Sequence, residues 1–229
     1  MKDSLRYAIL FGLMAIFLAL IACVWQGWYL IALWPAVSLA AVAVAYLGVG
    51  PQVFGKSLDG RLALLNRAIL LPYLVLTRGL WTLLRYTRGE TPFNQLTDRI
   101  YIGRRLLNKE VPSHFDCVID LTCEFSEPVT LRSKSYHSFP ILDASAPSVG
   151  QLREWVQSAA DLPGTVFVHC AEGHGRTALF AAALLLHLKH ARNPNEAMQF
   201  IKEKRPAVRL NHEQRRVLEL FHSELAASY

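Results

Sequence analysis

The feature that most constrains this chain is a long uncharged stretch near its N-terminus. Residues 7–55 contain no Lys, Arg, Asp or Glu, whereas the rest of the 229-residue chain is ordinarily polar. A membrane-spanning helix needs about 20 apolar residues, so the stretch has room for two spans. We expect a two-span transmembrane hairpin in residues 1–55, with helices at 7–24 and 29–47 and an aromatic turn between them at headgroup level.

The charges that flank the hairpin predict its orientation. Lys2 and Arg6 precede the first span, Lys56 and Arg61 follow the second, and the turn between the spans is uncharged. By the positive-inside rule both ends then lie in the cytoplasm. A cleaved signal peptide is the alternative, but the second span directly after the first argues against it. From the compact architecture we expect a multi-pass protein of a bacterial inner membrane.

Residues 56–90 predict a basic linker. Gly residues and Pro51 favour a loop at 48–60, and the apolar stretch 61–88 is interrupted too often by charge to span a membrane. Three arginines are spaced by nearly whole helical turns, which places them on one face of an amphipathic helix: Arg67, Arg78 and Arg85. Trp81 and Tyr73 would lie on the opposite face, and Pro72 should kink the helix. We expect this helix to lie in the membrane interface against anionic headgroups; packing on the following domain is the alternative.

Residues 91–229 have the pattern of one water-soluble α/β domain. Apolar β-branched runs predict strands at 100–103, 116–122, 136–142 and 165–169. Apolar periodicity and capping residues predict helices at 148–160, 177–190, 193–205 and 211–227. Strands that alternate with helices indicate a largely parallel sheet covered on both faces.

The segment 169–177, HCAEGHGRT, is the candidate reactive site. A glycine-containing turn between a strand and a helix binds phosphate through backbone N–H groups and the helix N-terminus. The same groups stabilise a thiolate at Cys170, and Arg176 offers a planar fork to two phosphate oxygens. Thr177 is placed to donate a hydrogen bond to the departing sulfur. Because phosphoryl transfer depends mainly on positioning and charge stabilisation, we expect no metal or cofactor.

The pattern His-Cys-x5-Arg-Thr resembles the signature loop of the protein tyrosine phosphatase superfamily, and its form here is most similar to the compact dual-specificity phosphatases. The resemblance implies a dual-specificity phosphatase-like domain and hydrolysis of phosphomonoesters through a phosphocysteine. It implies that the other loop residues bind or support the phosphoryl group: His169, Ala171, Glu172, Gly173, His174 and Gly175. A buried structural cysteine beside a helix-capping turn is the alternative.

Two further residues are matched to roles in the family. Asp143, in an Asp-x-x-x-Pro pattern upstream of the cysteine, corresponds to the general acid; the alternative is that it caps the 148–160 helix or turns the loop. Gln214 corresponds to a residue that orients the hydrolytic water, or is a surface helix residue. Glu172 departs from lipid phosphatases that carry Lys there, and it would repel a second phosphate.

Charge and cysteine content limit the remaining classes. The net charge of +6 gathers near the apolar region, so we expect no nucleic-acid partner. Four cysteines without paired spacing, and a thiolate that needs a reducing compartment, favour a cytosolic catalytic domain. We expect a membrane-anchored phosphoprotein phosphatase. The alternatives are a lipid phosphatase acting on a headgroup such as that of phosphatidylglycerophosphate, and a non-catalytic phosphate-binding scaffold.

Overall fold

The computed structural model describes residues 2–227 and divides the chain into two compact units. The N-terminal unit comprises Met1–Ser57, Arg61–Gly89 and Cys123–Ser126. The sheet unit comprises Leu58–Gly60, Glu90–Thr122 and Glu127–Tyr229.

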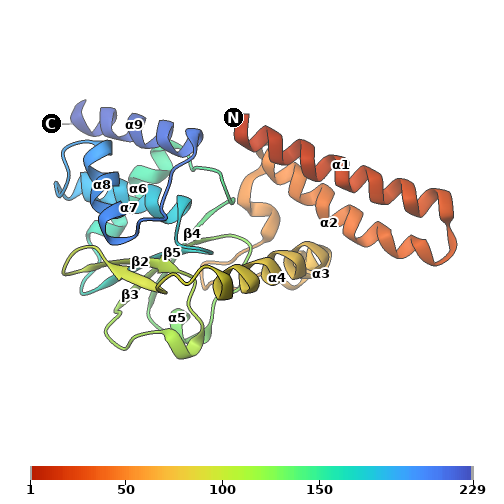
Figure 1. Ribbon diagram of the computed structural model, residues 1–229, viewed down its shortest axis with the longest axis horizontal. Helices are drawn as coiled ribbons and strands as arrows, with labels where there is room; N and C mark the ends of the chain where they lie inside the picture. Colours follow the sequence, from red (N-terminus) through yellow and green to blue (C-terminus); the bar gives the residue numbers. More distant parts are fainter. Residues whose placement is uncertain (1, 228–229) are drawn as a thin grey trace. The chain divides into compact units, whose positions relative to one another are not determined.

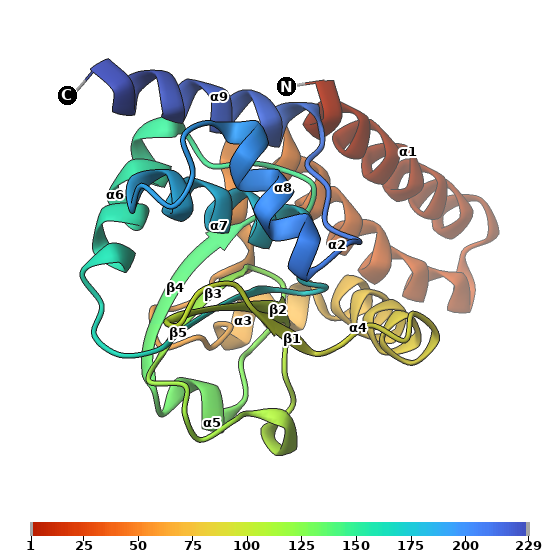
Figure 2. The ribbon, with the colours of Figure 1, turned by 60° about the vertical axis from the view of Figure 1, so that its left-hand side comes forward.

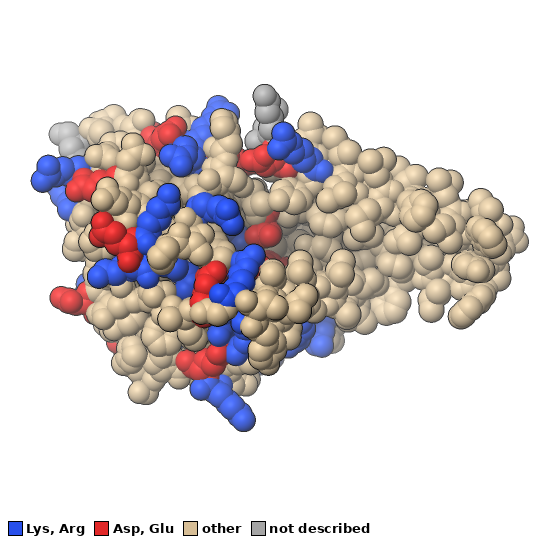
Figure 3. Space-filling model, viewed as in Figure 1, with Lys and Arg blue, Asp and Glu red and all other residues tan. Residues whose placement is uncertain are grey.

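Two long apolar helical segments form the first part of the N-terminal unit. Helix α1 (Lys2–Trp25) runs antiparallel to a segment made of η1 (Gly27–Ala32), α2 (Leu33–Val44), η2 (Ala45–Val49) and η3 (Gly50–Phe54) (Figure 1). Asp3–Trp25 and Gly27–Phe54 are each long and apolar enough to cross a membrane, with hydropathies of 2.7 and 2.1. Apart from its N-terminal end, the face of this helix pair seen in Figure 3 carries almost no charge.

The expected loop at 48–60 is wrong in its first half. Helical structure continues through η2 and η3 as far as Phe54, with breaks at Gly48 and Gly50, where φ is +131° and +84°. Pro51 lies in the first turn of η3, where its missing N–H costs no hydrogen bond. Glycine and proline therefore interrupt the helix here without ending it.

The basic linker forms two helices, α3 (Leu64–Ile69) and α4 (Leu71–Thr87), which meet at Leu70 just before Pro72. The expected position of Trp81 opposite the arginines is wrong: Trp81 is buried, and the Arg85 guanidinium lies 5.5 Å from the centre of its ring. Positions 78, 81 and 85 share one helical face at a spacing of 3.6 residues per turn. The opposite face of α4 exposes three leucines: Leu76, Leu80 and Leu83.

A five-stranded sheet forms the centre of the sheet unit. Its spatial order is β1 (Phe93–Gln95), β2 (Ile100–Arg104), β5 (Val166–Cys170), β3 (Cys117–Thr122) and β4 (Ser135–Ile141). All neighbours are parallel except β1 and β2. The mostly parallel α/β sheet expected from the sequence is confirmed, whereas the short edge strand β1 was not foreseen. Strand β5 lies in the middle of the sheet, and all five of its residues are buried.

Helices cover both faces of this sheet. One face carries α6 (Val149–Ala160), α7 (Gly175–His187), α8 (Pro194–Lys204) and α9 (His212–Ala227), and the other carries the short α5 (Val129–Arg132) (Figures 1 and 2). The short η4 (Asn108–Glu110) lies in the connection between β2 and β3. Ser148 and Asn193 cap α6 and α8 by accepting from Gln151 N–H and Glu196 N–H. Helix α7 is buried from Arg176 to Leu186, so its first turn is held firmly behind the end of β5.

Candidate active site

Cys170 is the last residue of β5, at the carboxyl edge of the parallel strands. Residues 171–174 turn the chain, and α7 begins at Gly175. The Gly173 N–H points at the Cys170 sulfur, with N and Sγ 3.3 Å apart. A backbone donor at this distance stabilises negative charge on sulfur. The strand, turn and helix expected around the signature segment are all present.

Glycine is required at one position of this turn, and a second glycine lies close to a neighbouring side chain. Gly173 has a φ of +74°, and a Cβ there would lie 2.4 Å from the carbonyl carbon of Gly103 in β2. A Cβ on Gly175 would lie 2.8 Å from Oε1 of Gln214 in α9. The loop is therefore confined between the backbone of β2 and a side chain of α9, and any larger residue would displace it.

Arg176 and Asp143 are brought together. Arg176 is 2% exposed, and its Nη1 donates to the Ile141 carbonyl at 3.0 Å. Its Nη2 lies 3.2 Å from Oδ1 of Asp143, a residue of the loop after β4 whose side chain is 71% exposed. An exposed carboxyl group next to a buried guanidinium can reach a substrate atom that the arginine does not contact. The alternative that Asp143 caps α6 is wrong, because Ser148 is the cap.

Thr177 and His169 are both fully buried. Within residues 2–227, no hydrogen-bond partner is found for Thr177 Oγ1 or for either ring nitrogen of His169. The His169 ring stacks on Phe167 at a centroid distance of 5.2 Å. Buried polar atoms that lack a partner are uncommon in folded proteins, so these two side chains, on either side of the loop, have unused hydrogen-bonding capacity.

His174 is fixed by two carboxylates. Its Nε2 lies 2.8 Å from Glu90 Oε2, and its Nδ1 lies 3.5 Å from Glu172 Oε2. The His174 side chain is 16% exposed, and those of Glu90 and Glu172 are 26% and 32% exposed. The accessible rim of the loop therefore carries two acidic groups, and Glu90 is one that the sequence did not single out.

Arg205, to which the sequence assigned no role, follows α8 and is 3% exposed. Its guanidinium donates to five acceptors: the carbonyls of Glu172, Gly173 and Thr91, Oδ1 of Asn94 and Oε2 of Glu90. Burial lowers the pKa of this group, while Glu90 and Cys170 raise it. It nevertheless stays charged, because arginine does not lose its proton in proteins. In the sequence Arg205 is the last of four consecutive charged residues, 202–205, so no local pattern sets it apart from its neighbours.

Gln214 is 1% exposed, so its interpretation as a surface residue is wrong. Its side-chain Nε2 donates to the Ser145 carbonyl at 3.1 Å, and Asn211 Nδ2 donates to the Ala144 carbonyl at 2.6 Å. These bonds fix the loop that carries Asp143 to the start of α9. Gln214 also lies against Gly175, and it therefore contacts both loops of the site.

One group in the described part of the chain has the residue types of a metal site: the buried side chains of Asp120, Glu127 and His169, whose ligand atoms lie within 4.8 Å of one another. Arg105 Nε already bonds to Glu127 at 2.7 Å. Asp120 Oδ2 accepts from the Tyr136 hydroxyl, and burial beside these carboxylates raises the pKa of Tyr136. A cation there would have to displace these donors, so the group fits an internal polar network better than a metal site.

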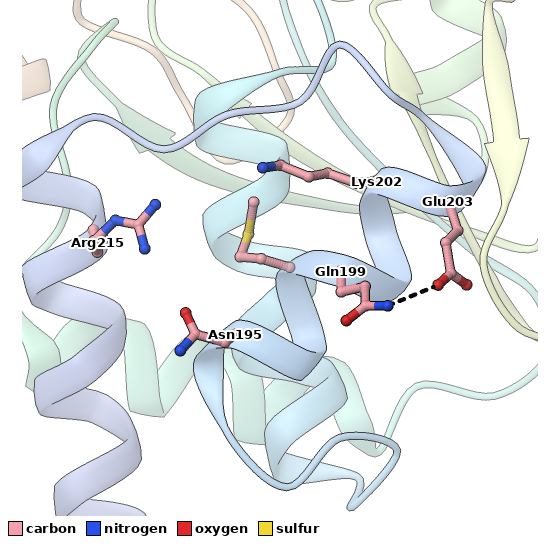
Figure 4. Close-up of a pocket in the computed structure, with 6 residues that line it drawn as sticks. Asn195, Gln199, Lys202, Glu203 and Arg215 are labelled. Atoms are coloured by element: carbon pink, nitrogen blue, oxygen red, sulfur yellow. Dashed lines mark hydrogen bonds between the residues drawn. The ribbon is translucent and has the colours of Figure 1, made fainter.

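The open groove in Figure 4 is separate from the loop. It has a volume of about 470 Å³ and lies between α8 and α9. It is lined by five polar or charged residues and one methionine: Asn195, Gln199, Lys202, Glu203, Arg215 and Met198. None of these residues belongs to residues 169–177, and the groove contains no strong nucleophile.

Comparison with known proteins gives the same assignment as the geometry. The rat protein named phosphatidylglycerophosphatase and protein-tyrosine phosphatase 1 is 26% identical over 147 residues, which are 61% of this chain and 73% of that protein. An Arabidopsis thaliana protein named phosphatidylinositol 3,4,5-trisphosphate 3-phosphatase and protein-tyrosine-phosphatase PTEN2B is 36% identical over 73 residues, covering 30% of this chain and 12% of its own length.

Solved structures have the same fold. The crystal structure of Tk-PTP in its active form has a TM-score of 0.52 at 26% identity and covers 58% of this chain and 97% of its own. The crystal structure of PTPMT1 in complex with PI(5)P has a TM-score of 0.53 at 20% identity, and the match covers 60% of this chain and 99% of that one. The profile described as the dual specificity phosphatase catalytic domain matches residues 105–224. Because this match includes the loop at 169–177 with its cysteine nucleophile, the chain belongs to the dual-specificity phosphatase family and is a phosphoric monoester hydrolase.

Proposed function

We propose that the reaction is carried out by four residues around the signature loop. Cys170 attacks the phosphoryl group, Arg176 and the loop N–H groups hold its oxygens, and Asp143 protonates the leaving group. Thr177 stabilises the sulfur as it departs, when water hydrolyses the phosphocysteine. The proposal is carried by two contacts: the Gly173 N–H lies 3.3 Å from Cys170 Sγ, and Arg176 Nη2 lies 3.2 Å from Asp143 Oδ1.

We assign supporting roles to the rest of the loop and to Gln214. His169, Ala171, Gly173 and Gly175 shape the phosphate site, and Glu172 and His174 form its rim. Gln214 orients the hydrolytic water, in keeping with its position between Gly175 and the Ser145 carbonyl.

The N-terminal unit is proposed to be the membrane anchor. In this arrangement residues 1–55 form a two-span hairpin in a bacterial inner membrane. Residues 56–90 are an interfacial linker, and residues 91–229 are the catalytic domain on the cytoplasmic side. Support comes from the exposed apolar surface of α1, where Leu13 and Phe17 are 61% and 63% exposed. The exposed leucines of α4 would enter the interface, and Arg67 and Arg78, two of the three arginines of the expected basic face, would meet anionic headgroups.

The proposed substrate is a phosphoprotein at the membrane. Two acidic groups on the rim, Glu90 and Glu172, disfavour a substrate with a second phosphate next to the one that is hydrolysed. The second candidate is a lipid with a single phosphomonoester headgroup. It is favoured by the exposed apolar face of α4 and by the name of the rat relative, which includes phosphatidylglycerophosphatase.

The test is phosphate release by the full-length protein in mixed micelles. A phosphotyrosine peptide and phosphatidylglycerophosphate are compared at equal concentration, with Cys170→Ser as the blank. A higher kcat/KM for the peptide supports the phosphoprotein assignment, whereas a preference for the lipid replaces it with the second candidate. Full activity of Cys170→Ser with either substrate would refute the mechanism.

A further inference from the structure

We propose that Arg205 is the positioning residue of the phosphate loop: it fixes two peptide groups so that their N–H donors face the phosphoryl group. This inference rests on the proposed function of the loop. It concerns a residue outside the signature segment, 32 and 33 positions along the chain from the two loop residues whose carbonyls it binds.

The argument starts from the geometry of the peptide bond. Arg205 Nη2 donates to the Glu172 carbonyl at 3.0 Å, and Arg205 Nε donates to the Gly173 carbonyl at 3.0 Å. No described peptide bond is cis. In a trans peptide the carbonyl and the following N–H point in opposite directions. Holding these two carbonyls outward therefore turns the N–H groups of Gly173 and His174 inward.

One of these two N–H groups is already engaged at the reactive atom. The Gly173 N–H belongs to the same peptide as the Glu172 carbonyl and lies 3.3 Å from Cys170 Sγ. Gly173, with its φ of +74°, offers little conformational resistance to rotation of the adjoining peptides. An external clamp is therefore needed to keep both donors in place before substrate binds.

The other side of the guanidinium is anchored just as fully. Arg205 Nη1 donates to the Thr91 carbonyl at 2.9 Å and to Asn94 Oδ1 at 3.0 Å, and Nη2 donates to Glu90 Oε2 at 2.9 Å. Arginine has five N–H donors in a rigid planar fork, and five acceptors surround it here. Residues 90–94, at the start of the sheet unit, are thereby connected to the phosphate loop.

Lysine cannot replace this arrangement. Its ammonium group keeps the charge beside Glu90 but offers three donors from one point, which cannot reach acceptors spread around a planar fork. Arg205→Lys should therefore leave the fold intact while freeing at least one of the two loop peptides. Because loss of one donor to a developing oxyanion costs about 10²–10³ in kcat, we expect about a 10- to 100-fold lower kcat/KM when the donors are loosened.

The matched control is Arg99→Lys. Arg99 also holds backbone carbonyls, those of Leu162 and Gly164, but these precede β5 at the end of the strand away from Cys170. Because Arg99 is exposed and Arg205 is buried, thermal unfolding of both variants is also measured, so that a loss of stability is separated from loosening of the loop. Competitive inhibition by inorganic phosphate reports the loop directly, because phosphate needs the N–H donors but no chemical step.

The experiment measures kcat, KM and phosphate inhibition for the full-length protein, Cys170→Ser, Arg205→Lys and Arg99→Lys. We expect Cys170→Ser to be inactive and Arg99→Lys to behave like the parent protein. In Arg205→Lys the inhibition constant for phosphate should rise by about tenfold or more. Parent-like phosphate inhibition in Arg205→Lys overturns the inference, while an active Cys170→Ser overturns the proposed function instead. If Arg205→Lys does not fold, Asn94→Ala removes one outer anchor that carries no charge, Oδ1 of Asn94. This variant should weaken phosphate inhibition severalfold, and no change would overturn the inference.

Discussion

Replacing Gly173 by alanine tests how closely the loop approaches β2. The new Cβ would lie 2.4 Å from the Gly103 carbonyl carbon, 2.5 Å from its oxygen and 2.6 Å from the Arg104 nitrogen. All three atoms are backbone atoms of β2, which cannot rotate away as a side chain would. The left-handed φ of +74° at this position adds a second cost.

The loss of folding stability in Gly173→Ala follows from the left-handed backbone and the steric clash. A left-handed conformation costs a non-glycine residue roughly 1–2 kcal/mol, and overpacking costs about 1–3 kcal/mol, so the sum is about 2–5 kcal/mol. For a unit of this size, 1 kcal/mol corresponds to about 2–4 °C in Tm, and we expect a fall of about 10 °C. The loop must also move by about 1 Å to relieve the contact, which can lower activity by about 10²-fold.

The assay follows the temperature at which β5 and α7 lose protection against hydrogen exchange, together with phosphate release. Gly150→Ala is the control, because no atom lies within 4 Å of a Cβ at that position of α6. It should be neutral or stabilising by up to about 1 kcal/mol. A Gly173→Ala variant with the stability and activity of the parent protein would refute the close approach of the loop to β2.

Three further predictions concern other parts of the sheet unit. Asp143→Asn should slow hydrolysis of a phosphoserine peptide by about 10²–10⁴ but affect p-nitrophenyl phosphate much less, since p-nitrophenolate leaves without a proton; equal losses would contradict its role as the acid. Arg105→Met leaves the buried Glu127 carboxylate without its 2.7 Å partner and should cost about 3–5 kcal/mol in denaturant unfolding; a loss below about 1 kcal/mol would exclude a charged pair. Hydrogen bonds from Thr165 hold the pKa of Asp116 below its ordinary value, so its stabilising effect is present above that value and is lost as pH falls through the lowered pKa. The stability difference between Asp116→Asn and the parent protein should therefore shrink below about pH 4; a difference independent of pH would contradict this assignment.

The sequence predicted the parts of the fold that local chemistry determines. Apolar β-branched runs indicated β2 to β5, and Ser148 and Asn193 indicated where α6 and α8 begin. The glycine-containing turn after β5 had the expected place between strand and helix. These signals depend on residues within a few positions of one another, and the structure retains them all.

The sequence could not predict contacts between distant segments. Strand β1 has only three residues and is defined by its pairing with β2, not by its own pattern. Trp81 is buried because of a tertiary contact with Phe125, at a ring distance of 5.7 Å, which overrides the expected helical face. The acceptors of Arg205 lie 32 to 115 positions away, so no local pattern indicates that it holds the loop.

The most direct test of the mechanism is to identify the phosphorylated residue. The full-length protein is mixed with a phosphotyrosine peptide, quenched in acid within one turnover and digested for mass spectrometry. A phosphoryl group on the peptide that contains Cys170, absent from Cys170→Ser, is the result we predict. A phosphoryl group on another residue, or turnover by Cys170→Ser, would contradict nucleophilic catalysis by this cysteine.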